Sequence, residues 1–394
     1  MATHLAYGGA ERVLSELSLR LPGHIEQVLV LFQNSITYPH RARLICLESE
    51  SASLAFYGRA FRLVERASRL RRVIETERPD CVVGFLDEAN FLVAMLARRA
   101  ILTVHAGLSR KARSLARRLL EAVVPLVFRR AWIVAVSEGC RGELVEKYRL
   151  PSERVLTINN PIDVEGIRRA AADGVGAHDE TCTVPRIVCA GRLSPEKGQA
   201  HLIRVFAALR AKLACRLMLI GSGECEQELR RLSADLGVEE GIAFLGWRPN
   251  PHPYVACGAV FVLPSHLEGF GNVLLEAMAC GVPVVASDCR YGPREILAPG
   301  SDRRRTTGSV EFAEFGVLVT PCDERKRCWQ DETLTTHEHA LLSAIETLLR
   351  DHVLRAEYTR RGAQRAGDFD PEKIVNQYVR LMKQVASDDV WVTG

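Results

Sequence analysis

The chain has 394 residues, of which 47% are hydrophobic and 25% are charged, and its formal net charge is +4. This length is too great for one ordinary hydrophobic core, so two domains are expected. No apolar run approaches the roughly 18 residues of a membrane span, and no signal peptide opens the chain. The twelve cysteines form no C-x-x-C and no zinc pattern. We therefore expect a cytoplasmic protein without a metal site.

The positive charge is concentrated in the first part of the chain. Residues 1–170 hold 26 basic and 18 acidic residues, a balance of +8, whereas 171–394 hold 26 and 30, a balance of −4. Nine basic residues and one acid lie between Arg98 and Arg130, with apolar residues interleaved. This segment predicts peripheral contact with the cytoplasmic face of a membrane, or else a solvated arginine-rich helix. Nucleic acid is not expected, because the segment contains no known nucleic-acid-binding motif.

The first half alternates short apolar runs with amphipathic ones, which is typical of a parallel sheet covered by helices. This alternation predicts an N-terminal domain over 1–165, with a helix over Tyr57–Thr76. The runs predicted as buried strands are Gln27–Phe32, Arg43–Leu47, Cys81–Leu86, Ile101–Val104 and Trp132–Val136.

The alternation restarts after a polar, glycine-rich loop over 174–185 and predicts a second domain over 166–370. A helix over 371–385 is expected to pack back toward the N-terminal domain, before a frayed tail that ends at 394. The expected fold is α/β, with two doubly wound domains facing across a cleft and ligands at the carboxyl ends of the strands. The predicted strands of the second domain are 186–190, 216–220, 242–245, 259–263 and 282–286, and its predicted helices include 196–212, 226–236 and 272–279.

The stretch LPSHLEGFGNVLLEAMACGVPVVAS, 263–287, places two glutamates where a buried strand gives way to a helix. Glu268 is predicted to project from the turn, where the free N–H groups near Gly271 and Asn272 meet the positive end of the helix dipole. Such a turn binds an anion, usually a phosphate. Glu276, about one turn into the helix, is placed to accept hydrogen bonds from a ribose. The alternative is an acid that complements the dipole, with Glu276 solvated.

A second motif is VCAGRLSPEKGQAHLI, 188–203. A strand ends at Gly191, Ser194 is predicted to cap the next helix, and Lys197 lies in its first turn. A cation there opposes the helix dipole, which is easier to explain if it faces an anion. Arg192 as a planar fork and Lys197 as a point charge would hold a diphosphate. The alternative is two surface cations.

Weaker signals lie elsewhere. Gly8 and Gly9 open an amphipathic helix, so the backbone there can approach a phosphate or a sugar closely. His105 follows a strand and would touch a sugar hydroxyl or the reaction centre, unless it is a satisfied loop histidine. Trp247 lies in a proline-rich stretch and suits a nucleobase edge, unless the stretch is only a rigid loop. The histidines at 337 and 339 are expected on the surface without partners.

Taken together, these motifs resemble the retaining glycosyltransferases of the GT4 type, which have the GT-B fold. The matching residues are Gly8-Gly9-Ala10-Glu11-Arg12, the stretch GRLSPEKG, the two glutamates in EGFGNVLLEAMACGVPVV, NPHPYVACGAVFVLPS, and GPREIL with EFGVLVTP. The last pair looks most like members that extend lipid-linked oligosaccharides or polysaccharides. The resemblance implies a hexosyl or N-acetylhexosaminyl transfer with retention of configuration.

The resemblance also assigns roles. Arg192 and Lys197 would bind the donor diphosphate, Glu276 the ribose, and Gly271 and Asn272 would supply backbone contacts. Glu268 and His105 would lie by the donor sugar, and Gly8 and Gly9 near the phosphates and the acceptor. The donor would be a nucleotide-sugar, with UDP as the expected nucleotide. Neither a cofactor nor a metal is expected, because cations and a helix terminus stabilise the leaving diphosphate.

One departure from the family concerns the start of the chain. The family begins with a strand of several apolar residues, whereas only MATHLAY precedes Gly8. A short strand over Thr3–Ala6, a start further upstream and an impaired domain are the alternatives. The rival functions are an epimerase or phosphorylase on the same architecture, and a degenerate binder of nucleotide-sugar without activity.

Overall fold

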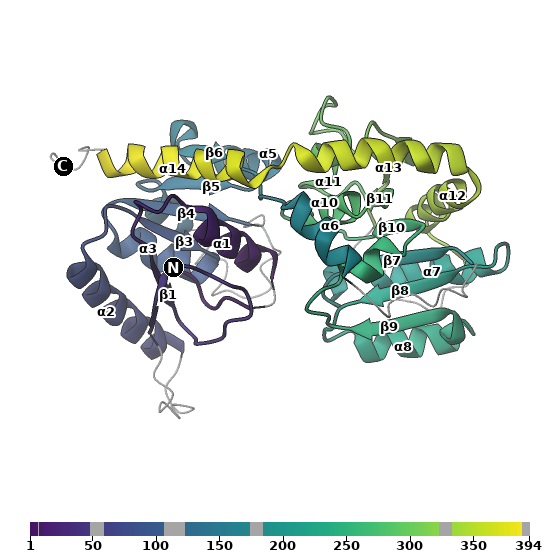
Figure 1. The fold of residues 1–394 in the computed structure, drawn as a ribbon, viewed down its shortest axis with the longest axis horizontal. Helices are drawn as coiled ribbons and strands as arrows, with labels where there is room; N and C mark the ends of the chain where they lie inside the picture. The colour runs from purple at the N-terminus through teal and green to yellow at the C-terminus, as the bar shows by residue number, and fades with distance from the viewer. Residues whose placement is uncertain (7, 48–58, 106–122, 174–183, 323–332, 388–394) are drawn as a thin grey trace. The chain divides into compact units, whose positions relative to one another are not determined.

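The computed structural model describes residues 1–6, 8–47, 59–105, 123–173, 184–322 and 333–387 (Figure 1). The chain forms two compact units, each built around mostly parallel strands. Unit 1 comprises Met1–Pro161 and Pro371–Gly394, and unit 2 comprises Ile162–Asp370. Most of the predicted basic segment, the predicted loop over 174–185 and the predicted frayed tail lie outside the described residues.

The strands of unit 1 follow the apolar runs of the sequence. β1 (Val28–Leu31) and β2 (Arg43–Cys46) form a parallel pair. The other four strands lie in the order β3-β4-β5-β6, also parallel, and β4 is buried at every residue. The fourth, β6, was not predicted, because a strand of three residues gives almost no apolar pattern. These four strands are β3 (Val82–Phe85), β4 (Ala100–Val104), β5 (Trp132–Ala135) and β6 (Val155–Thr157).

The start of the chain lies between β1 and β3 (Figure 1). Ala2 pairs with β1, since its N–H donates to Val30 O at 3.0 Å and its carbonyl accepts from Phe32 N at 3.2 Å. On the other side, Phe85 N donates to Met1 O at 2.9 Å. Of the alternatives for the start of the chain, a short strand over Thr3–Ala6 is seen only in part. Leu5 forms a single parallel bridge with Ile36, whereas the pairing with β1 and β3 falls on the first three residues.

The helices of unit 1 bury one apolar face each. α1 (Gly9–Arg20) buries Val13, Leu14 and Leu17, which stand at the spacing that one face of a helix requires. α14 (Pro371–Ser387) buries a similar row and packs against α1 and β4. The remaining helical segments are α2 (Arg59–Glu77), α3 (Asp87–Leu96), α5 (Glu138–Gly142), the π-helical η1 (Glu143–Lys147) and the 3₁₀ turn η2 (Ser152–Arg154).

Unit 2 contains a seven-stranded sheet in the order β12-β13-β11-β10-β7-β8-β9, parallel except for β12. The chain moves outward from β7 through β8 to β9, and then returns to β10 on the other side of β7. The order therefore reverses between β7 and β10, and ligands bind at such a switch point. The strands are β7 (Arg186–Ala190), β8 (Arg216–Ile220), β9 (Ile242–Gly246), β10 (Val260–Leu263), β11 (Val284–Ser287), β12 (Val310–Phe312) and β13 (Val317–Val319).

The helix predicted over 196–212 is wrong at its start. Pro195–Lys197 is a separate 3₁₀ turn, η3, and α7 (Gln199–Arg210) begins after Gly198, whose φ of 67° interrupts the helix. Ser194 makes no side-chain capping hydrogen bond. The other helices of unit 2 are α6 (Val164–Ala172), α8 (Glu226–Asp235), η4 (Glu239–Gly241), α9 (His252–Ala256), α10 (Asn272–Ala279), α11 (Pro293–Leu297), α12 (Thr336–Arg350) and α13 (His352–Gly367).

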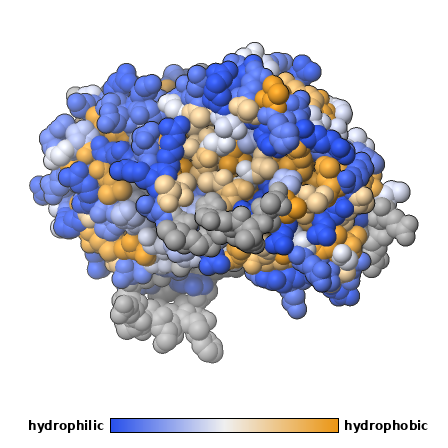
Figure 2. All heavy atoms as spheres, turned by 45° about the vertical axis from the view of Figure 1, so that its right-hand side comes forward, coloured by the Kyte–Doolittle hydropathy of each residue, from blue (hydrophilic) through white to orange (hydrophobic). Residues whose placement is uncertain are grey.

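Hydrophilic residues cover most of the face drawn in Figure 2, with apolar residues among them. A few large apolar side chains are exposed, including Leu126 at 69%, Met95 at 60% and Trp247 at 41%. Among the described residues, no helix is both long enough and apolar enough to cross a membrane.

Candidate functional site

An ion pair joins the two turns at the switch point of unit 2. Lys197 Nζ lies 2.7 Å from Glu268 Oε1, so the turn after β7 meets the turn after β10. The Glu268 side chain is 8% exposed and the Lys197 side chain is 25% exposed. The Lys197 side chain is therefore not fully enclosed by the pair, which leaves it able to interact with a second anion.

Backbone contacts fix the two turns against each other. His266 N donates to Glu196 O at 3.1 Å. A Cβ at Gly198 would lie 2.3 Å from Pro264 O, so only glycine allows this close approach. The positive φ of Gly198 also favours glycine at this position. The distance between Lys197 and Glu268 is thus set by backbone packing as well as by charge.

The helix α10 begins at the same edge of the sheet. Its N-cap, Gly271, has a φ of 92° and provides no side-chain cap for the N–H groups of the first turn, which begins at Asn272. Both ends of the helix agree with the prediction. Five residues into the helix, the Glu276 side chain is 13% exposed, and its Oε2 lies 4.0 Å from His252 Nε2. A helix N-terminus without a side-chain cap is suited to an anion.

The remaining predicted residues of unit 2 lie along this carboxyl edge. Gly191 ends β7, and a Cβ at Gly221 would lie 2.0 Å from Gly191 O. Gly221 N in turn donates to Gly246 O at 2.9 Å, and Trp247 follows directly. Arg192 is exposed, and within the described part of the chain its guanidinium makes no hydrogen bond or ion pair. Arg192 is therefore available to an anionic ligand.

Two buried cysteines lie close enough to the ion pair for its charges to influence the pKa of their thiols. Burial raises the pKa of the Cys189 thiol to about 12, with opposing contributions from Lys197 and Glu268. Burial also raises the pKa of Cys289, and the Glu268 charge adds to this effect. Both thiols stay protonated at neutral pH, so neither serves as a nucleophile.

The glycine turn of unit 1 already holds a carboxylate. Gly8 caps α1, and a Cβ there would lie 2.0 Å from Glu11 Oε2. Glu11 is 7% exposed and lies 3.5 Å from His4 Nδ1. The sequence prediction named Gly8 and Gly9 and gave no role to Glu11. A carboxylate in this position accepts hydrogen bonds from hydroxyl groups and repels phosphate.

His105 follows β4 in unit 1 and stacks on Phe85, with ring centroids 5.7 Å apart. The residue as a whole is partly exposed, but its Nε2 is buried and has no hydrogen-bond partner within the described residues. Burial lowers its pKa to about 4. The imidazole is therefore neutral at physiological pH and can donate or accept a hydrogen bond.

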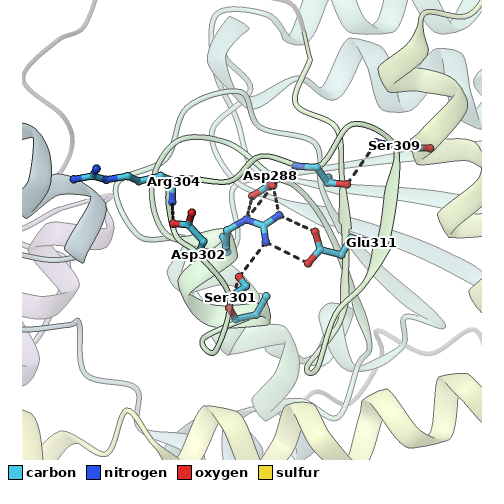
Figure 3. Close-up of polar contacts among 9 residues, drawn as sticks. Asp288, Ser301, Asp302, Arg304, Ser309 and Glu311 are labelled. Carbon is cyan, nitrogen blue, oxygen red and sulfur yellow. Dashed lines mark hydrogen bonds and ion pairs between the residues drawn. The ribbon is translucent and has the colours of Figure 1, made fainter.

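The sequence prediction missed two further groups in unit 2. His252 approaches Glu276, and its Nδ1 lies 2.9 Å from Asn250 Oδ1. Arg294 lies between Asp288 and Glu311 in a buried cluster at the end of β11 (Figure 3). Both residues occur in stretches that the resemblance includes, but no local pattern shows their partners. Within the described ranges, no group of three or more His, Cys, Asp or Glu residues is placed to hold a metal ion.

Comparison with known protein families identifies both halves of the chain. Residues 7–165 match the family described as Glycosyltransferase Family 4, and residues 184–327 match Glycosyl transferases group 1. The two halves of the chain thus match two glycosyltransferase families. The second match includes Arg192, Lys197, Glu268 and Glu276, and the first includes Gly8, Gly9 and His105.

Relatives and solved structures agree with this assignment. A Campylobacter jejuni N-acetylgalactosamine-N,N'-diacetylbacillosaminyl-diphospho-undecaprenol 4-alpha-N-acetylgalactosaminyltransferase is 28% identical over 96% of this chain and 97% of its own. The lipopolysaccharide core biosynthesis glycosyltransferase LpsE of Rhizobium meliloti is 30% identical over 55% of each chain. The structure of Anabaena HepE in complex with UDP and glucose superposes with a TM-score of 0.74, at 20% identity, over 97% of this chain and 99% of that one. The expected GT-B fold is confirmed.

Proposed function

We propose that this protein transfers a hexosyl or N-acetylhexosaminyl group from a UDP-sugar to a lipid-linked saccharide or polysaccharide. The observation that carries the proposal is the Lys197–Glu268 pair at the switch point of unit 2, next to the α10 N-terminus that has no side-chain cap. A cation and a helix terminus together favour a diphosphate. The Campylobacter relative, similar along nearly its whole length, is named for a diphospho-undecaprenol acceptor, which supports the acceptor class.

On this proposal the diphosphate, the ribose and the nucleobase of the donor contact different residues. The exposed Arg192 and the partly exposed Lys197 bind the diphosphate, with backbone contacts from Gly191, Gly271 and Asn272. Glu276 accepts hydrogen bonds from the ribose hydroxyls. Trp247, 41% exposed on the same edge, contacts the nucleobase. The two cations offset charge on the leaving diphosphate, so we expect the reaction to proceed without a metal ion.

The proposed chemistry retains the configuration of the donor sugar. The bond from the anomeric carbon to the diphosphate oxygen breaks, and the acceptor oxygen forms its bond on the same face. The acceptor proton passes to an oxygen of the leaving diphosphate. Glu268, whose other interaction is with Lys197, stabilises positive charge that develops on the sugar ring. This role requires the carboxylate form of Glu268.

For the acceptor side, the proposal relies on groups of unit 1. The Glu11 carboxylate beside Gly8 and Gly9 is suited to an acceptor hydroxyl, and so is the neutral imidazole of His105. A hydroxyl can donate to the carboxylate and either donate to or accept from the imidazole.

Peripheral membrane contact belongs to the same proposal. Val123 and Leu126 are exposed at 41% and 69%, and the exposed Arg129 and Arg130 follow them closely in the chain. Apolar side chains beside cations favour an anionic lipid surface. We expect Leu126→Glu to reduce co-sedimentation with vesicles that contain phosphatidylglycerol, while Val64→Glu, a change of a 68% exposed valine on α2, serves as the matched control.

Donor turnover tests the proposal directly. The purified chain is incubated with a panel of UDP- and GDP-sugars, with and without bacterial lipid extract, and nucleotide release is followed. Release from one donor that rises with lipid extract and persists in EDTA is the expected result. Release of a free 2-epimer or dependence on inorganic phosphate would favour the rival enzymes. Binding of UDP without turnover would favour a protein that only binds the nucleotide-sugar.

A further inference from the structure

Arg294, a buried arginine in α11, has all three of its side-chain nitrogen atoms engaged. Arg294 Nε lies 3.1 Å from both carboxylate oxygens of Asp288, and Nη2 donates to Asp288 Oδ2. On the other edge, Nη1 and Nη2 lie 3.2 and 2.9 Å from the two Glu311 oxygens, and Nη1 also lies 3.0 Å from Ser301 Oγ. Figure 3 shows Asp288, Ser301 and Glu311 around this cluster, with dashed lines for the contacts. We call Arg294, Asp288 and Glu311 the arginine clamp.

The charges of the clamp support one another. Burial opposes the charge on Arg294, but its hydrogen bonds to Glu311 and Asp288 outweigh that effect and raise its pKa. The bond from Arg294 likewise lowers the pKa of Glu311. Arg294 and Asp288 are each 3% exposed. Thr307 N adds a hydrogen bond of 2.7 Å to Asp288 Oδ2, so the segment that carries Thr307 is held by the same group.

The clamp holds the turn that runs from Asp288 to Gly292. Gly292 has a φ of 89°, and a Cβ there would lie 1.9 Å from Phe270 O. Phe270 belongs to the turn that carries Glu268 and Gly271. Cys289, in the middle of the clamped turn, feels the charges of both Glu268 and Lys197. The clamped turn is therefore packed directly against the Glu268 turn. At Gly292 the two backbones leave no room for a side chain.

We propose that the arginine clamp positions Glu268 for the sugar of the donor, with Arg294 as the positioning residue. The inference rests on the proposed function, since it names a determinant of the same site. The clamp bonds to the turn after β11, which supports the turn after β10. It makes no contact with Arg192, whose turn follows β7 and faces the diphosphate. Relaxing the clamp should therefore affect recognition of the sugar more than recognition of the nucleotide.

A role in stability alone leads to a different expectation. A variant that merely lowers the folded fraction reduces the apparent binding of UDP and of UDP-sugar in equal proportion. A variant that shifts Glu268 changes the ratio of the two affinities, because only the UDP-sugar has a sugar beside Glu268, whereas UDP keeps its contacts with Arg192 and Lys197. The ratio, measured on folded protein, thus separates positioning from stability.

The test uses Arg294→Lys, which keeps the charge but loses the fork, and Glu311→Gln, which removes one side of the clamp. Glu314→Gln is the matched control, because Glu314 is exposed next to β12 and lies outside the clamp. Calorimetry gives the Kd of UDP and of the UDP-sugar that the wild type turns over. Nucleotide release is compared for that donor and for the UDP-sugar that differs by the N-acetyl group, and melting curves confirm folding.

We expect Arg294→Lys to lower the affinity ratio of UDP-sugar to UDP at least fivefold and to change the donor selectivity, with UDP affinity kept within twofold. Glu311→Gln should have a smaller effect in the same direction, and it carries the test if Arg294→Lys does not fold. If the ratio of UDP-sugar affinity to UDP affinity is unchanged in both folded variants, or if both ligands lose affinity equally, the inference is overturned. The proposed function would stand in that case. A wild type that binds neither UDP nor any UDP-sugar would overturn the proposed function and this inference with it.

Discussion

Two charged clusters of unit 2 lie at the same edge of its sheet, and they differ in how completely their charges are matched. The Lys197 ammonium contacts one oxygen of Glu268, and its side chain is 25% exposed. The Arg294 guanidinium contacts both oxygens of two carboxylates, and its side chain is 4% exposed. The first cluster has capacity for a ligand, whereas the second is saturated. Similar residue types thus serve binding in one place and support in the other.

Removing the cation of the saturated cluster should have the largest effect on stability. Arg294→Met leaves Asp288 and Glu311 facing each other without a counter-charge, so we expect unit 2 to lose about 3–5 kcal/mol of unfolding free energy. Glu268→Gln should cost within about 1 kcal/mol, because Lys197 can reach water. Urea titration followed by hydrogen exchange of β11 and β13 measures unit 2 alone. Equal losses in the two variants would contradict the distinction between the clusters.

Glu268→Gln should instead impair turnover. We expect kcat to fall about 100-fold or more, because the positive charge on the sugar ring loses its carboxylate. The freed Lys197 ammonium should bind the diphosphate of UDP as tightly as before or several-fold more tightly. Nucleotide release gives kcat and calorimetry gives the Kd of UDP, with Glu314→Gln as the control. A Glu268→Gln variant with weaker UDP binding and normal kcat would reverse the assigned role.

The comparison also shows what the sequence can predict. Strands of four or five apolar residues and the helix over Asn272–Ala279 follow from local pattern, since Gly271 before that helix and Gly281 after it adopt positive φ. The helix start near Lys197 was mispredicted because the positive φ of Gly198 interrupts the helix. Gly198 packs against Pro264 O, and the local sequence does not show this contact. Both glutamates and both cations of the donor motifs were identified, and their roles stay predictions.

The saturated cluster could not be predicted in the same way. Arg294 occurs in GPREIL, but its partners depend on how α11 and β12 pack after folding. His337 is a similar case. It was expected on the surface, yet it is 3% exposed, with Nδ1 at 2.5 Å from Thr320 O. A polar sequence around a histidine does not show that the sheet and α7 cover it.

This buried histidine allows the comparison to be extended to pH. Burial lowers the pKa of His337 to about 4, and His201 and His266 add to the effect while Thr320 O and Glu338 oppose it. The folded state thus binds fewer protons than the unfolded state, so stability falls as pH drops from about 6.5 to about 4. His337→Gln keeps a donor for Thr320 O and removes this titration. We expect it to lessen the loss of stability by up to about 1.4 kcal/mol per pH unit there.

Urea titrations of unit 2 at several pH values between 4 and 7 measure that slope. Burial opposes the charge on Glu338, but bonds from His201, Thr335 and Arg204 lower its pKa to about 2, so its own contribution is lost only as pH falls from about 4.5 toward 2. The two effects therefore occupy different pH ranges. His339→Gln, at the exposed neighbouring histidine, is the control. A slope above pH 4.5 that is identical in wild type and His337→Gln would rule out His337 as its source.

The smallest expected effect concerns Glu276, which belongs to neither cluster. On the proposed function, Glu276→Ala weakens UDP binding about tenfold, or about 1.4 kcal/mol, because the ribose hydroxyls lose their acceptor. The same variant should no longer distinguish UDP from 2′-deoxy-UDP, whereas Glu268→Gln should still distinguish them. His252→Gln should give a smaller loss, since His252 Nε2 lies 4.0 Å from Glu276 Oε2, which is too far for a hydrogen bond. If Glu276→Ala keeps the preference for UDP over 2′-deoxy-UDP, the ribose contact belongs to another residue, while the assignment of the diphosphate to Arg192 and Lys197 is unaffected.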